Sequence, residues 1–176
     1  MKLLKVWAAT GVMALASWAS AVTPAATSVA ASAPDAAQVQ AAHDLLVAMQ
    51  AEKLMRMTAG ASKFADDKQR QAVMAKLDKI APEEVYRRLS LPVARLVAAD
   101  TATEMTRFYT SSYGQRLLKQ TYNSGPSLNA GDPVPTAAEK IELKRPAYLK
   151  ADQAFQQVKP AIRHEVFVLV KDIVSK

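Results

Sequence analysis

Two histidines, His43 and His164, are the side chains of this sequence best suited to bind a metal ion or to transfer protons near neutral pH. A zinc site requires three or four ligands at defined spacings, and neither histidine has a second histidine four residues away. The chain also has no cysteine to complete such a set. We therefore predict that each is a surface or boundary residue of a helix, since a metal site would require the two to meet in space.

Paired carboxylates occur at Asp66 and Asp67 and again at Glu83 and Glu84. Neighbouring residues of a helix point about 100° apart, so neither pair shares one site as an acid/base dyad must. Negative charge at a helix start, where the backbone dipole is positive, explains both pairs more simply. The sequence has no nucleophile elbow, Walker-type loop or dinucleotide fingerprint. It therefore predicts no catalytic, metal-binding or cofactor-binding residues and no cofactor.

The most unusual segment is residues 108–118, where three aromatic residues surround a serine-rich turn. Ser111 is a suitable cap for a new helix, and Gly114 follows where that helix would ordinarily carry a side chain. Glycine destabilises a helix by up to about 1 kcal/mol relative to alanine, so we expect something to pack against its bare backbone. We favour a tight crossing of two helices; the alternative is an aromatic-rimmed groove for an anionic or peptide ligand. The candidate residues of that groove are Arg107, Phe108, Tyr109, Tyr113, Gly114 and Arg116.

The same segment resembles a motif of the bacterial exported proteins grouped as domain of unknown function 2059. That motif is Phe-Tyr-x-Ser/Thr-Pro-x-Gly-x-x-Leu, and this chain has Phe-Tyr-Thr-Ser-Ser-Tyr-Gly-Gln-Arg-Leu at residues 108–117. The resemblance covers residues 80–122 and departs at Ser112, where the family's usual proline would pre-set the first helical turn. Residues 123–135 look like an insertion. The resemblance implies an all-helical exported protein and brings no established activity or site.

The first 21 residues are arranged like a cleaved secretory signal peptide. Lys2 and Lys5 form a positive start, an uncharged apolar stretch occupies residues 6–16, and Ala-Ser-Ala at 19–21 provides small residues for cleavage after Ala21. The alternative, a membrane anchor, needs about 20 consecutive apolar residues, and this stretch is shorter. No cysteine follows that could carry a lipid anchor. We therefore expect a periplasmic protein, with release from the cell as the less favoured destination.

Residues 22–34 consist mainly of Ala, Ser, Thr and Pro. Such a segment buries too little apolar surface to offset the entropy lost on ordering, so we predict a disordered linker. Loss of the two leader lysines leaves 21 basic and 16 acidic residues, a net charge of +5. These charges alternate along the chain instead of clustering, which argues against nucleic-acid binding. No later apolar stretch is long enough to predict a transmembrane segment.

A single all-α domain is predicted for residues 35–176. Few glycines, abundant helix-forming residues and no two-residue alternation indicate a small bundle of about five to six helices, some kinked at proline. Without cysteines, packed apolar helix faces must stabilise it. Three helices are predicted with both ends: 35–59 with Asp35 as cap, 66–80, and 145–174 with a kink at Pro160. Two more begin at Pro82, with a bend or break at Pro92, and at Ser111. Capping boxes at 101–104 and 136–139 predict two further helix starts. A long loop is predicted for residues 123–135.

These observations favour a non-enzymatic binding or interaction module of the periplasm, acting through helix faces, a protein partner or self-association. One alternative is a cell-envelope surface binder that uses net positive charge to associate weakly with anionic lipid or peptidoglycan. A second alternative is an enzyme of unidentified class, because convergent active sites leave no local motif.

Overall fold

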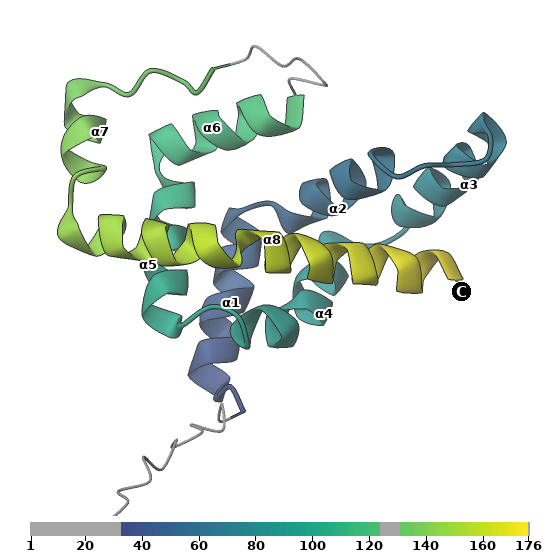
Figure 1. Cartoon of the computed structure of the whole chain (residues 1–176), viewed down its shortest axis with the longest axis horizontal. Coiled ribbons are helices and arrows are strands. Elements are labelled where there is room, and N and C mark those ends of the chain that lie inside the picture. Colours follow the sequence, from purple (N-terminus) through teal and green to yellow (C-terminus); the bar gives the residue numbers. More distant parts are fainter. Residues whose placement is uncertain (1–32, 124–130, 176) are drawn as a thin grey trace, which may run out of the picture. The chain divides into compact units, whose positions relative to one another are not determined.

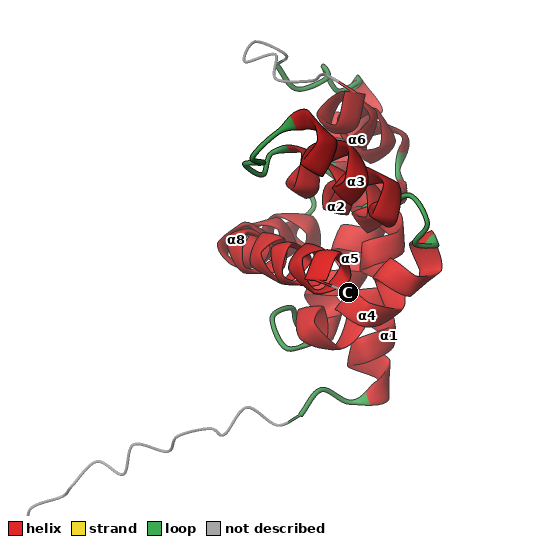
Figure 2. Cartoon of the chain, turned by 90° about the vertical axis from the view of Figure 1, so that its right-hand side faces the viewer, coloured by secondary structure: helices red, strands yellow, loops and turns green. Residues whose placement is uncertain are grey.

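The computed structural model describes residues 33–123 and 131–175, and this part of the chain contains eight α-helices and no strand (Figure 1, Figure 2). The helices are α1 Ala36–Ala48, α2 Ala51–Gly60, α3 Asp67–Leu77, α4 Pro82–Ala94, α5 Ala99–Thr110, α6 Ser112–Asn123, α7 Ala137–Glu142 and α8 Pro146–Ser175. The all-α prediction is confirmed, whereas the expected number of helices is too low. The predicted signal peptide and residues 22–32 of the predicted linker lie outside the described residues.

α1 and α2 are separated by Gln50, which adopts a left-handed backbone conformation with a φ of 55°. The continuous helix predicted for residues 35–59 is therefore wrong. Asp35 nevertheless caps α1 as predicted, because its carboxylate accepts a hydrogen bond from the Gln38 N–H at 2.7 Å. The break lets α1 pack against α4 and α5 while α2 packs mainly against α8.

α3 and α4 begin close to the predicted residues. Asp66 caps α3 by accepting a hydrogen bond from the Gln69 N–H at 2.7 Å, and Pro82 occupies the start of α4. Pro92 does not break α4, which continues past it to Ala94.

α5 begins at Ala99, so the capping box predicted for residues 101–104 is wrong. Glu104 lies inside the helix and pairs with Arg145 at 2.6 Å. The other two predicted starts are confirmed. The Ser111 hydroxyl accepts a hydrogen bond from the Gly114 N–H at 3.1 Å before α6, and Thr136 forms a complete capping box before α7.

α8 is the longest helix and packs against α2, α3, α4 and α5. It continues through Pro160, and the five residues predicted for its apolar face are buried: Phe155, Ile162, Val166, Leu169 and Ile173. Burying such a side chain stabilises the fold by about 1.5–3 kcal/mol. Of the predicted loop, Asn123 ends α6, residues 131–135 are not helical, and residues 124–130 lie outside the described part.

No helix of the described residues combines the length and the apolar character that crossing a bilayer would require. α8 has the length, but polar and charged side chains interrupt its sequence throughout.

Candidate ligand-binding cleft

α5 and α6 meet at a tight turn that brings their backbones into direct contact. A Cβ atom added to Gly114 would lie 2.1 Å from the Phe108 carbonyl oxygen and 2.8 Å from Tyr109 Cα. Only glycine fits at this distance, so the close helix crossing favoured from the sequence is present. The crossing directs α6 away from α5 and leaves α6 facing α8 across a gap (Figure 1).

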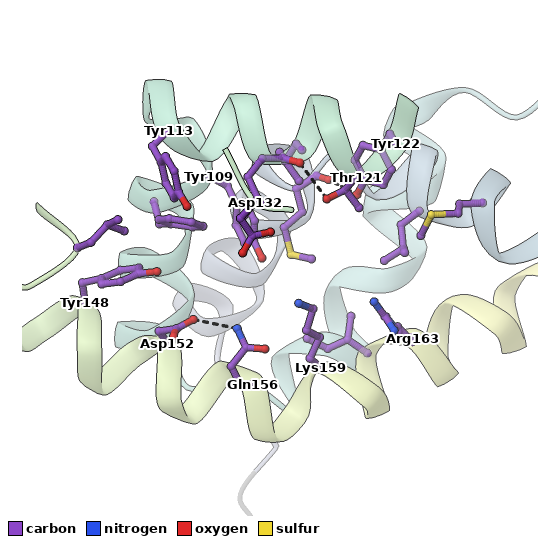
Figure 3. A pocket seen from close by; sticks show the side chains of 18 residues that line it. Tyr109, Tyr113, Thr121, Tyr122, Asp132, Tyr148, Asp152, Gln156, Lys159 and Arg163 are labelled. Carbon is purple, nitrogen blue, oxygen red and sulfur yellow. Dashed lines mark hydrogen bonds between the residues drawn. The ribbon is translucent and has the colours of Figure 1, made fainter. Parts of the chain in front are cut away.

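A cleft of about 580 Å³ lies between α6 and α8 (Figure 3). Its floor is apolar and is formed by Leu54 on α2, Leu118 on α6, Ile162 on α8 and Met49, which directly follows α1. All four side chains are buried. This volume is within the usual range of small-molecule sites, which are mostly apolar with a few polar groups at defined positions.

One end of the cleft is aromatic. Phe108 lies at the centre of an aromatic cluster, with ring centroids 5.0 Å from Tyr109, 6.2 Å from Tyr113 and 5.1 Å from Tyr148. The hydroxyls of these three tyrosines make no hydrogen bond with any described residue, and the three rings line the cleft (Figure 3). The cluster therefore offers three unused hydroxyl groups to a ligand.

Tyr109 is the most buried member of this cluster, with 6% of its surface exposed. Burial raises the pKa of its hydroxyl to about 12, Asp152 adds to the increase, and Arg163 opposes it. Tyr109 therefore stays protonated at neutral pH and can donate a hydrogen bond into the cleft.

The wall formed by α8 carries a polar stripe that faces the cleft. The α8 stripe consists of Tyr148, Asp152, Gln156, Lys159 and Arg163, whose spacing of three or four residues places them on one side of the helix (Figure 3). The Asp152 carboxylate accepts a hydrogen bond from the Gln156 amide at 2.9 Å. The buried apolar face of α8 lies beside this stripe, and Ile162 belongs both to that face and to the floor of the cleft. One helix therefore serves both the core and the cleft.

The positive groups of the α8 stripe have no acidic partner. Lys159 and Arg163 make no ion pair with any described residue. Most arginines of residues 33–123 and 131–175 do form an ion pair with a carboxylate. In those residues, Arg95 and Arg163 are the two arginines without such a pair. Two unpaired positive charges four residues apart therefore face a cavity.

The wall formed by α6 is held in place by its own hydrogen bonds. The Tyr122 hydroxyl donates to the Met49 carbonyl at 2.7 Å, and burial raises the Tyr122 pKa. The Thr121 hydroxyl donates to the Leu117 carbonyl at 2.9 Å. Asp132 also borders the cleft, from the segment before α7.

The predicted groove residues divide between this cleft and α7. Phe108, Tyr109 and Tyr113 line the cleft, and Gly114 is buried at the crossing of α5 and α6. The other two, Arg107 and Arg116, pair with carboxylates of α7, and Arg107 also lines a second cavity beside that helix.

α7 has no buried residue and is attached by ion pairs. Arg116 binds both carboxylate oxygens of Glu139, at 2.9 and 2.8 Å, and Arg107 binds Glu142 at 3.1 Å. Arg116, together with the Thr136 backbone, lowers the Glu139 pKa to about 2. A second cavity of about 380 Å³ lies where α7 faces Phe108 and its neighbours.

Sequence reasoning missed the α8 half of the cleft. Asp152, Lys159 and Arg163 follow a regular helical spacing, but that pattern is equally typical of a solvated helix face. The unusual feature, unpaired charge beside a cavity, depends on contacts between distant segments.

The histidines are separate from the cleft. The His43 imidazole on α1 lies 2.9 Å from a Glu83 carboxylate oxygen on α4, which raises the His43 pKa. His164 is exposed on α8. Within the residues that the structure describes, no three His, Cys, Asp or Glu side chains gather in a group able to hold a metal ion.

Besides Glu83, which contacts His43, the paired carboxylates have local partners. Asp66 caps α3, Asp67 pairs with Arg70 at 3.1 Å, and Glu84 pairs with Arg87 at 2.7 Å. Each is accounted for by helix-start electrostatics or by a neighbouring charge.

Comparisons of the chain with known protein families, with curated protein sequences and with solved structures return no match.

Proposed function

We propose that this protein is a non-enzymatic binding module whose cleft between α6 and α8 takes up a small amphipathic ligand. The observation that carries the proposal is the cleft of about 580 Å³, which combines an apolar floor with free hydroxyls and unpaired charges. A ligand can therefore bury apolar surface on the floor and bond these polar groups without first breaking an ion pair among the described residues.

Binding explains the side chains of the cleft better than catalysis does. Among the described residues, its lining contains no histidine, cysteine or serine. The Thr121 hydroxyl is bonded to its own helix, and Tyr109 holds its proton up to a pH of about 12. A general base needs a pKa near the working pH, and neither the Thr121 nor the Tyr109 hydroxyl meets that requirement.

The leader supports a periplasmic location for this binding module, and we include that location in the proposal. The motif that resembles domain of unknown function 2059 supplies Tyr109, Tyr113 and Gly114 to the cleft and its supporting turn. We accordingly propose membership of that family, with ligand binding as a role for its aromatic motif.

The uncharged dye N-phenylnaphthylamine, which fluoresces in apolar surroundings, tests the proposal. Gln156→Trp places a large ring in the cleft, whereas Gln157→Trp places the same ring on an exposed position of α8 outside it. We expect Gln156→Trp to weaken dye binding at least tenfold and Gln157→Trp to leave it unchanged. Equal dye binding by both variants, with unchanged circular dichroism, would overturn the proposal.

A further inference from the structure

The charges along the α8 stripe are segregated by sign. Asp152 lies beside the aromatic cluster, whereas Lys159 and Arg163 lie at the other end (Figure 3). Building on the proposed function, we propose that the ligand is a short peptide with free ends. Its amino group lies at Asp152 and its carboxylate lies between Lys159 and Arg163.

The Asp152 end of the cleft is suited to a cation. An ammonium group there meets the Asp152 carboxylate together with the rings of Tyr113 and Tyr148, which line the same cleft. Aromatic faces attract cations, and the attraction is strengthened when water is excluded. The unpaired hydroxyls of these rings add acceptors for the ammonium hydrogens.

The Lys159 end is suited to an anion. Arg163 presents a planar group that binds a carboxylate through two parallel hydrogen bonds, and Lys159 adds a second positive charge one turn away. Neither has to leave an acidic partner among the described residues in order to bind. Tyr109 lies between the two ends (Figure 3).

The distance between the two ends sets the length of the ligand. A helix rises about 1.5 Å per residue, so Lys159 and Arg163 lie about 10 and 16 Å along α8 from Asp152. An extended peptide advances about 3.3 Å per residue, which corresponds to about three to five residues. The opposite charges of a zwitterionic lipid headgroup are only a few bonds apart, too close to meet both ends.

The middle of the cleft is suited to a peptide backbone with apolar side chains. The Gln156 amide both donates and accepts hydrogen bonds, as a peptide group requires. Leu118 and Ile162 form an apolar floor below it. Asp132 also borders the cleft, and its charge disfavours acidic side chains in the ligand.

Displacement of N-phenylnaphthylamine from the full chain tests this inference. The competitors are a mixture of tetrapeptides of Ala, Leu, Phe and Ser with both ends free, the same mixture acetylated at the amino end, and the same mixture amidated at the carboxyl end. We expect the free mixture to displace half of the dye at a concentration about tenfold lower than either blocked mixture.

Charge variants assign each end of the peptide to its side chain. Asp152→Asn should abolish the effect of acetylation, and Lys159→Gln combined with Arg163→Gln should abolish the effect of amidation. Lys171→Gln, on α8 outside the cleft, should preserve both effects. Circular dichroism shows whether each variant is folded, and the effect of each block is measured relative to the variant's own dye affinity.

Equal potency of the three mixtures, or no displacement of the dye by any of them, would overturn the assignment of a peptide ligand. The proposed function would still stand if dye binding depended on the cleft. Loss of cleft-dependent dye binding would instead overturn the proposed function.

Discussion

Replacing Gly114 with alanine separates helix propensity from packing at the crossing of α5 and α6. Propensity alone predicts that Gly114→Ala stabilises the protein, since alanine is favoured over glycine inside a helix by about 1 kcal/mol. The added Cβ, however, would lie 2.1 Å from the Phe108 carbonyl oxygen and 2.8 Å from Tyr109 Cα. Both are backbone atoms that cannot rotate away. Overpacking costs about 1–3 kcal/mol, and a contact of 2.1 Å with backbone places this substitution at the upper end of that range. After the propensity gain of about 1 kcal/mol, we expect a net loss of about 2 kcal/mol.

Urea unfolding followed by circular dichroism measures this difference, and Gly60→Ala is its matched control. Gly60 is also helical, but an added Cβ there meets nothing within 4 Å. We expect Gly60→Ala to be neutral or to stabilise the protein by up to about 1 kcal/mol. Opposite signs for the two substitutions support the crossing. An increase in stability for Gly114→Ala would show that α6 does not approach α5 this closely.

Three further predictions concern hydrogen bonds and titrating groups. Tyr122→Phe leaves the Met49 carbonyl without its donor and should lower the free energy of unfolding by about 1 kcal/mol in urea titrations. The Tyr109 hydroxyl has no partner among the described residues, so Tyr109→Phe should change the free energy of unfolding by less than about 0.5 kcal/mol. Because Glu83 raises the His43 pKa, the pair stabilises the fold below about pH 6.5 and loses that effect as the pH rises through the folded-state pKa. The stability difference between the native protein and His43→Gln should therefore be about 0.2–1 kcal/mol at about pH 5.5 and should shrink by about pH 8.5, and a pH-independent difference would argue against the pair. Glu139→Gln should lower the hydrogen-exchange protection of α7 at neutral pH. The native protein should show the same loss as the pH falls from 4.5 to about 2, because the Glu139 pKa is depressed from 4.5 to about 2. Unchanged protection of α7 in either experiment would contradict its attachment by ion pairs.

Much of the fold was predictable because helix starts depend on local chemistry. Asp35, Pro82, Ser111 and Thr136 each begin or cap a helix as expected, since a cap involves only the next three or four residues. The apolar face of α8 was predictable for the same reason, because its period is a property of one segment.

The errors arose where distant contacts decide the structure. Gln50 ends α1 in a left-handed conformation although no glycine or proline marks it, because the two flanking helices pack on different neighbours. Thr101 and Glu104 have the spacing of a capping box, yet α5 begins two residues before Thr101 and Glu104 pairs with Arg145.

The candidate site was half predictable. The aromatic residues of 108–118 were recognisable because a glycine and a serine cap interrupt a helical pattern there. Arg107 and Arg116 were assigned to a ligand, but they bind carboxylates of α7. The opposite wall of the cleft lies some forty residues later in the chain, and only the packing of α8 on α5 brings it near.

The central claim is that α6 and α8 enclose a ligand site. Its most direct test is an NMR titration with N-phenylnaphthylamine in which the amide chemical shifts are followed residue by residue. We expect saturable shifts confined to the segments that line the cleft, namely residues 49–57, 108–122, 132, 143 and 148–163. Shifts concentrated on α1, α3 and α4, or no saturable change anywhere, would contradict the account.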